Sequence, residues 1–316
     1  MPTGVEQLEL AAKCDMQTDQ RPRTRPKLVL IAGLQKSGTT LLLRLLTDHT
    51  SVASSPFSGV EGHDFWGNVP SHAPCEFPAG TIYAGHHGEL GHEIPAAAAD
   101  GHMRRILEQR LAALHVATPV IVNKNPYHTM RLPWLKSVFP DCFIVATVRR
   151  AVPNIYSMLK KYVRQDERDR PWREDGWYGV KPRHWRSMLS DDTLLQCTRQ
   201  WCAVMGKLWA DRAHVDLFVG YPELCREPVK TVRRILGAAC GEDVAGNVEV
   251  PPLVCYDDEY RRGAPLRSKN EEARLQPTAN EVIELPPFTD DEIARCQEPC
   301  REIESRFAVL RRSGEC

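Results

Sequence analysis

A short glycine-containing loop constrains this chain more than any other part of the sequence. The loop is residues 33–40, GLQKSGTT, and it follows the apolar run Leu28–Ala32 and precedes the leucine-rich stretch 41–46. This order predicts a buried strand, a tight turn and a helix. Backbone N–H groups of such a turn, together with the positive end of the helix dipole, form an anion-binding site.

The position of the lysine in this loop indicates what kind of anion it binds. Gly33 and Gly38 have the spacing of the triphosphate-binding loop GxxxxGK[ST], but Thr39 occupies the place of its lysine. The loop's lysine is Lys36, inside the turn, where it cannot cover a γ-phosphate in the usual way. We therefore expect a site for the phosphate end of a mononucleotide, and not for a triphosphate.

The rest of the chain alternates short apolar runs with helical patterns, which predicts an α/β fold with a parallel, doubly wound sheet flanked by helices. Predicted strands are 28–32, 120–122, 143–148 and 215–219, with 51–53 a weaker candidate. Predicted helices are 103–115, 130–138, 154–163, 193–212, 228–239 and 290–310. Ligands of such folds bind beyond the carboxyl ends of the strands.

Length and composition limit the organisation and the location of the protein. The 316 residues are enough for one domain over 27–316, preceded by a flexible N-terminal lead-in at 1–26 and interrupted by inserted loops at 54–100 and 165–192. The 11 cysteines are scattered, without a C-x-x-C pair, which is typical of reduced thiols in a cytoplasmic protein. No apolar run approaches the ~20 residues of a membrane span.

Charge and histidine spacing bear on the possible partners. The 41 basic and 41 acidic residues cancel, so the sequence offers no global field that would attract nucleic acid. His86, His87 and His92 have no carboxylate or thiolate at a ligand spacing, and we expect no metal. The oligomeric state is open.

A second candidate anion site follows the predicted strand 143–148. Arg149 comes at its tip, and Ser157 follows eight residues later near the expected start of a helix, whose first turn suits Pro153. Arginine offers a rigid fork for a phosphate, and serine adds a short donor.

These two elements together resemble the sulfotransferases that use 3′-phosphoadenosine-5′-phosphosulfate (PAPS). The family's 5′-phosphosulfate motif, [PQ]-[KR]-S-G-T-[TS], is matched by residues 35–40, and its 3′-phosphate motif places an Arg eight residues before a Ser, as here. The resemblance implies a P-loop-like sulfotransferase fold and PAPS as co-substrate, with PAP as product. The implied cofactor-binding residues are Lys36, Ser37, Gly38, Thr39, Thr40, Arg149 and Ser157.

Further segments extend the resemblance over roughly residues 27–310. Residues 123–126, NKNP, look like the N-K-D-P segment of tyrosylprotein sulfotransferases and their bacterial relatives. Tyr221 stands where the family has a tyrosine that contacts the adenine, and Lys161 matches a basic position after the motif serine. Ser268 and Lys269 resemble the late loop that closes over the cofactor, although 261–263, RRG, offers another register for it.

The resemblance also implies catalytic roles. Sulfuryl transfer is an in-line displacement in which charge grows on the oxygen that leaves with the 5′-phosphate, and Lys36 is placed to neutralise it. Lys124 resembles the lysine that supports the transferring sulfuryl group. Glu61 is the favoured general base, His63 on the same loop is its rival, and His128 is a third candidate.

Several functional alternatives stay open at this point. The acceptor is a hydroxyl of a carbohydrate, a phenol, another small molecule or a peptide tyrosine. Trp172, Trp177, Tyr178 and Trp185 form either a lid over this acceptor or part of the core. A nucleoside or small-molecule kinase and a catalytically silent PAP-binding protein are the alternatives to a sulfotransferase.

Overall fold

The computed structural model describes residues 25–67, 90–114, 116–163, 176–244, 248–250 and 287–312. The described strands are β1 (Lys27–Ala32), β2 (Ala53–Ser54), β3 (Val120–Lys124), β4 (Phe143–Val148) and β5 (Leu217–Gly220). The described α-helices are α2 (Thr39–Thr47), α3 (His63–Trp66), α4 (Gly101–Ala112), α5 (Leu132–Val138), α6 (Ala151–Val163), α7 (Thr193–Ala210), α8 (Tyr221–Arg226), α9 (Pro228–Cys240) and α12 (Asp290–Arg312). Short 3₁₀ helices are η1 (Ala96–Ala98), η2 (Pro126–Met130), η4 (Trp185–Met188), η5 (Arg212–His214) and η6 (Glu242–Val244).

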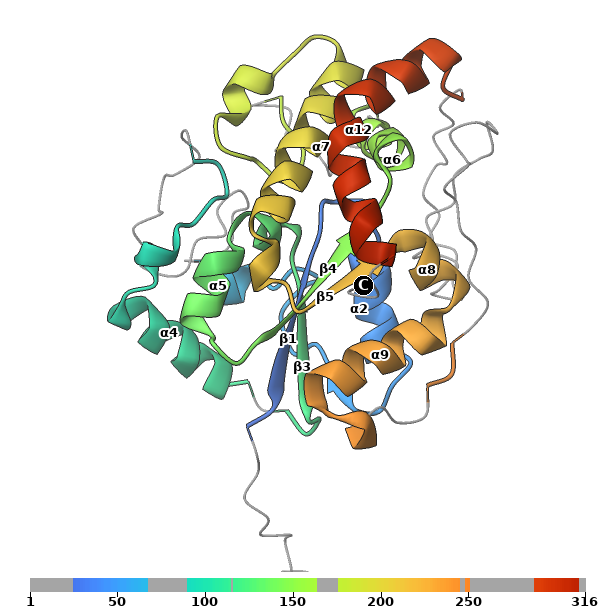
Figure 1. The fold of residues 1–316 in the computed structure, drawn as a ribbon. Helices are drawn as coiled ribbons and strands as arrows, with labels where there is room; N and C mark the ends of the chain where they lie inside the picture. Colours follow the sequence, from blue (N-terminus) through green and yellow to red (C-terminus); the bar gives the residue numbers. More distant parts are fainter. Residues whose placement is uncertain are drawn as a thin grey trace, which may run out of the picture.

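The five strands form one parallel sheet in the order β2-β3-β1-β4-β5, which confirms the predicted fold class (Figure 1). The central strand β1 pairs with β3 on one side and with β4 on the other. The chain therefore reverses its direction of winding at β1, and in such sheets the crevice for a ligand opens at this point. The loop that follows β1 is the glycine-containing loop of residues 33–38.

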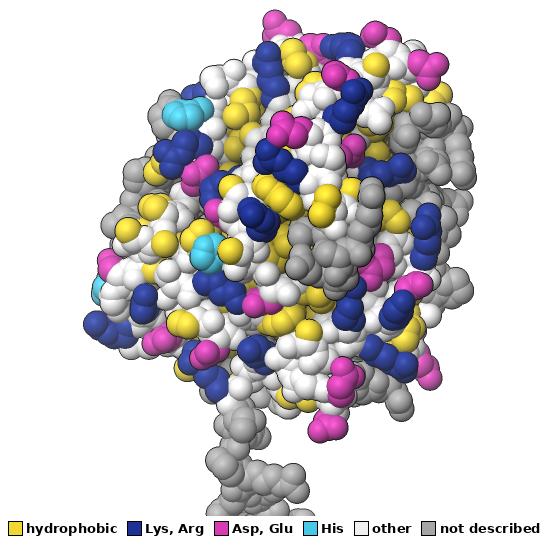
Figure 2. All heavy atoms as spheres, in the orientation of Figure 1, with side chains coloured by type: hydrophobic (Ala, Val, Ile, Leu, Met, Phe, Trp, Pro, Cys, Tyr) yellow, Lys and Arg dark blue, Asp and Glu magenta, His cyan; other side chains and the backbone are white. Residues whose placement is uncertain are grey.

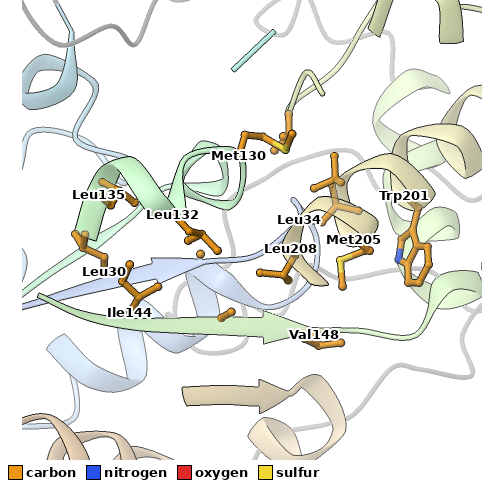
Figure 3. Packing of buried hydrophobic residues seen from close by; sticks show 14 of the residues in the cluster. Leu30, Leu34, Met130, Leu132, Leu135, Ile144, Val148, Trp201, Met205 and Leu208 are labelled. Carbon is orange, nitrogen blue, oxygen red and sulfur yellow. The ribbon is translucent and has the colours of Figure 1, made fainter. Parts of the chain in front are cut away.

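Side chains of β1 alternate between two cores. Leu28, Leu30 and Ala32 face the larger core, which the apolar sides of α4, α5, α6, α7 and α12 complete. Val29 and Ile31 face the other core, which is closed by α2, α8 and α9. Figure 3 shows part of the larger core, where Leu30 and Ile144 of the sheet pack near Leu132 and Leu135 of α5 and Leu208 of α7. Burial on both faces explains the apolar runs in β1, β3 and β4.

The element boundaries differ from the predicted ones at three places that bear on the site. α6 begins at Ala151, so Ser157 lies in its second turn and not near its start. The stretch expected as an inserted loop at 54–100 contains α3 and η1, and η4 lies within 165–192. Two aromatic residues of this second stretch, Trp177 and Trp185, are buried and pack edge to face, at 5.7 Å between ring centroids. These two tryptophans belong to the core and not to a lid.

Among the helices that the structure describes, none combines the length and the apolar character that crossing a membrane requires. On the face that Figure 2 shows, Lys and Arg side chains are interspersed with Asp and Glu side chains. This pattern agrees with the neutral sum of charges in the sequence.

Candidate functional site

The loop between β1 and α2 has the backbone of an anion-binding turn. Lys36 lies in the left-handed region with φ 67°, and among described non-glycine residues only His184 shares a positive φ. Holding a lysine there costs about 1–3 kcal/mol, which points to a functional constraint. α2 then begins at Thr39, and the N–H groups of its first turn have no partner within the helix. The backbone of Thr39 and Thr40 is therefore placed to bind an oxyanion.

Close packing against β4 requires glycine at the start of this loop. A Cβ on Gly33 would lie 2.3 Å from Oγ1 of Thr147, and its φ of 139° is unfavourable for other residues. The N–H of Gly33 donates to Oγ1 of Thr129 on η2 at 2.8 Å. Ser37 is buried, with its hydroxyl 2.7 Å from that of Thr147. The Ser37 side chain thus fixes the loop to the neighbouring strand.

The second candidate anion site touches the first one directly. Arg149 follows β4, is 6% exposed, and donates from Nη1 to the carbonyl oxygen of Lys36 at 3.1 Å. Its guanidinium lies 4.2 Å from the centroid of the Tyr221 ring. That ring also limits the loop, because a Cβ on Gly38 would come within 2.8 Å of it. Arg149 and Tyr221 therefore pack against each other and against the loop of residues 33–38.

α6 is joined to the same loop. Nδ2 of Asn154 donates to the carbonyl oxygen of Gln35 at 3.0 Å. Ser157 and Lys161 are half-buried on α6, at three and seven residues after Asn154. Residues at this spacing share one helix face. Asn154 therefore joins α6 to the loop, and Ser157 lies one turn further along the helix than the sequence predicts.

The favoured general base is held by three consecutive residues at the end of β3. Glu61 forms an ion pair through its carboxylate with Lys124, which is 2% exposed. The carbonyl oxygen of Glu61 accepts hydrogen bonds from the side-chain amides of Asn123, at 3.2 Å, and Asn125, at 3.3 Å. Backbone and side chain of Glu61 are thus both positioned by the segment 123–125.

A buried polar network lies behind this segment. Oδ1 of Asn123 accepts from Nε1 of Trp66 at 2.9 Å and is 2.8 Å from Nε2 of His128. Because this oxygen can only accept, Nε2 of His128 carries the proton, and Nδ1 is left to accept from Nη2 of Arg131 at 3.3 Å. The guanidinium of Arg131 lies over the Trp66 ring at 5.2 Å and over the Trp134 ring at 5.9 Å.

Burial and the charges of Arg131 and Lys124 lower the pKa of His128 well below its usual 6.5. A neutral imidazole with both nitrogens engaged has no lone pair left to remove a proton from an acceptor. His128 therefore orients Asn123. This reduces the candidates for the base to Glu61 and His63.

The segment after β3 and the segment 176–183 both contact the loop, through Gly33 and Gln35 respectively. Gln35 donates to the carbonyl oxygen of Tyr178 at 3.3 Å and accepts from the N–H of Val180 at 3.2 Å. The His92 ring stacks on Tyr127 at 3.7 Å. The His63 ring, at the start of α3, lies 6.4 Å from the same tyrosine. The rings of His63, Tyr127 and His92 thus lie near one another, and His63 is two residues after Glu61.

Some predicted residues lie outside the described part of the chain. These are Ser268, Lys269, the alternative register at 261–263, Trp172, His86 and His87. Within the described segments, no group of three or more His, Cys, Asp or Glu side chains is arranged to hold a metal ion.

Sequence reasoning missed several residues that shape the site. The motifs of the sequence include Asn123, Asn154 and Gln35, so the sequence indicates the positions of these residues but not their roles. Thr129, Thr147 and Arg131 carry no local signal, because their importance comes from partners far away in the sequence.

A comparison with curated protein sequences finds no significant match. Among solved structures, a sulfotransferase of Mycobacterium tuberculosis is 19% identical, with a TM-score of 0.37, over 70% of this chain and 71% of the other. A sulfotransferase of Mycobacterium avium is 16% identical, with a TM-score of 0.43, over 95% of this chain and 81% of the other. The model of one sulfotransferase family matches residues 26–244. Because this match covers well over half of the sequence, the chain belongs to the sulfotransferase family.

Proposed function

We propose that the protein is a PAPS-dependent sulfotransferase that transfers a sulfuryl group to an acceptor hydroxyl. The observation that carries the proposal is the contact between the two candidate anion sites, in which Arg149 donates to the carbonyl oxygen of Lys36. A nucleotide with phosphates at both 5′ and 3′ positions offers one anion for each site. A nucleoside triphosphate carries its negative charges in one chain and has no group for Arg149.

The residues present fit such a nucleotide. The left-handed turn at Lys36 and the first-turn amides of α2, which have no partner within the helix, suit the 5′ end, and we assign Lys36, Thr39 and Thr40 to it. We assign the 3′-phosphate to Arg149, Ser157 and Lys161, and the adenine of the nucleotide to Tyr221. When bound, PAPS supplies an activated sulfuryl group whose bridging oxygen becomes negative as the bond breaks.

Lys36 and Lys124 act on the charge that develops in the reaction. We propose that Lys36 neutralises the oxygen of the leaving 5′-phosphate, because it is the basic side chain of the turn. Lys124 is directed by its ion pair toward Glu61, at the end of the neighbouring strand β3. A lysine there stabilises negative charge on the transferring group, and preorganised charges of this kind require little reorganisation during the reaction.

Glu61 is the proposed general base. Its carboxylate is about one-third exposed, so an acceptor hydroxyl can approach it, while hydrogen bonds fix its backbone. The acceptor proton moves to an oxygen of Glu61 as the new bond to sulfur forms. The His63 ring, two residues after Glu61, and the Tyr127 ring near it, which stacks on His92, suit a flat or ring-shaped acceptor, such as a phenol or a sugar.

Ligand-induced stabilisation tests the proposal without knowledge of the acceptor. PAP at ~100 times its dissociation constant should raise the free energy of unfolding by about 2.7 kcal/mol, which a thermal melt detects. AMP, which lacks the 3′-phosphate, and ATP with magnesium should produce smaller shifts. Equal shifts from ATP with magnesium and from PAP would contradict the proposal and favour a kinase. Release of PAP from PAPS in the presence of an acceptor panel then distinguishes an enzyme from a silent binding protein.

A further inference from the structure

The packing of α7 against α12 brings two thiols from distant parts of the chain together. The Sγ atoms of Cys202 on α7 and Cys300 on α12 lie 3.3 Å apart. Cys300 is buried, whereas Cys202 is partly exposed. In a disulfide the two sulfurs are about 2.05 Å apart, so an approach of roughly 1 Å would join them.

We propose that Cys202 and Cys300 are a modification site at which a peroxide converts the two thiols into an intramolecular disulfide. The inference does not depend on the proposed transferase activity. It rests on the contact between the two sulfurs and on the accessibility of one of them.

The two thiols differ in reactivity, and the difference assigns their roles. The hydrogen bond with Cys300 lowers the pKa of Cys202, and the same contact together with burial raises the pKa of Cys300. Two further thiols of this interface are buried, and burial raises the pKa of Cys197 and raises that of Cys296 to about 11. Because the thiolate is the reactive form, Cys202 is the thiol of this interface that attacks the oxidant.

The chemistry balances with a peroxide as the oxidant. The Cys202 thiolate attacks one oxygen of hydrogen peroxide, the O–O bond breaks, and water leaves after taking up a proton. The sulfenic acid formed on Cys202 is then attacked by the sulfur of Cys300. The S–S bond forms, the S–O bond breaks, and the hydroxide leaves as a second water with the proton of Cys300. A small-molecule dithiol reverses the reaction by thiol–disulfide exchange.

The bond would hold α12, a helix that contacts the first residue of α6. Glu304 lies four residues after Cys300, on the same side of α12. Its carboxylate accepts the N–H of Ala151, the first residue of α6 and two residues after Arg149. α12 is also joined to the start of α7 by the ion pair of Arg295 with Asp192. A disulfide between Cys202 and Cys300 would therefore fix the helix that holds the N-terminus of α6.

The experiment uses the full chain with Cys14, Cys75, Cys255 and Cys316 changed to Ser, since these four lie outside the described residues. Hydrogen peroxide should lower the intact mass by about 2 Da, the loss of two hydrogen atoms. Non-reducing tryptic digestion should give one cross-linked pair, 200–207 with 296–301, which dithiothreitol separates. The melting temperature should rise on oxidation and return on reduction.

Single variants provide the controls. Cys202→Ser and Cys300→Ser should each abolish both the mass loss and the rise in melting temperature. Cys296→Ser is the matched control, because Cys296 is a buried thiol on the same tryptic peptide, and it should leave the cross-link intact. A sulfinic acid on Cys202 beside a free Cys300, a disulfide between other cysteines or between two molecules, or an unchanged mass would each overturn the proposal. The peptide map of the parent protein decides this even if a variant fails to fold.

Discussion

Asn123 is the residue whose removal should test the architecture of the site most directly. Its side chain makes three hydrogen bonds, to Trp66, His128 and the carbonyl oxygen of Glu61, and it is fully buried. In Asn123→Ala, the indole N–H of Trp66 and the Nε2–H of His128 lose their acceptor. Each orphaned buried donor costs about 1–3 kcal/mol. Because neighbouring side chains can move into the small space left by the amide, or a water can fill it, we expect a total destabilisation in the lower half of the summed range, about 2–4 kcal/mol.

The measurement is equilibrium unfolding in urea, followed by tryptophan fluorescence and by circular dichroism. Equal slopes for parent and variant are required for a valid comparison. A double-mutant cycle with Trp66→Phe isolates the cause, because phenylalanine has no N–H to leave unpaired. The double variant should be less destabilised than the sum of the single variants, by about 1 kcal/mol. Strict additivity, or a cost of Asn123→Ala below 1 kcal/mol, would refute the network as the source of rigidity behind Glu61.

The remaining predictions concern binding, turnover and pH. Arg149→Ala should weaken PAP binding in calorimetry by roughly 10- to 150-fold, the equivalent of about 1.5–3 kcal/mol for a charged hydrogen bond, whereas Lys36→Ala should mainly lower turnover, by ~10²–10³-fold; the reverse pattern would exchange their roles. Glu61→Gln should keep PAP binding and lower PAPS turnover by ~10²–10⁴-fold, and if His63→Asn has that effect instead, His63 is the base. Folding lowers the pKa of His128, so the unfolded chain takes up this proton at a higher pH than the folded chain does. The free energy of unfolding therefore falls as the pH drops below about 6.5, by up to ~1.4 kcal/mol per pH unit. His128→Gln should reduce this pH dependence in urea titrations at pH 7.5 and 5.5, and an unchanged dependence would contradict the assignment.

The sheet and the order of its elements along the chain could be predicted from the sequence, because both faces of a parallel sheet are buried. β1, β3 and β4 each contain at least three consecutive apolar residues, LVLIA, VIV and FIVA, and runs of this kind give a strong signal. Boundaries were less accessible. The start of α6 at Ala151 depends on the carboxylate of Glu304, which accepts the N–H of Ala151 from more than 150 residues away. Trp177 is buried, with its ring N–H donating to the carbonyl oxygen of Val180 at 2.9 Å. The aromatic composition of 165–192 does not reveal this hydrogen bond.

The candidate site divides in the same way. Local sequence determined the loop 33–40, Lys36 inside its turn and Arg149 directly after a strand, because neighbouring residues determine turns and strand ends. It also indicated Glu61, on the segment between β2 and α3. Only the tertiary structure showed that Arg149 donates to Lys36, that 123–125 hold Glu61, and that His128 is a neutral residue that orients Asn123. These roles arise from hydrogen bonds and desolvation between segments far apart in the chain. Such effects depend on distance in space, which the order of residues alone does not contain.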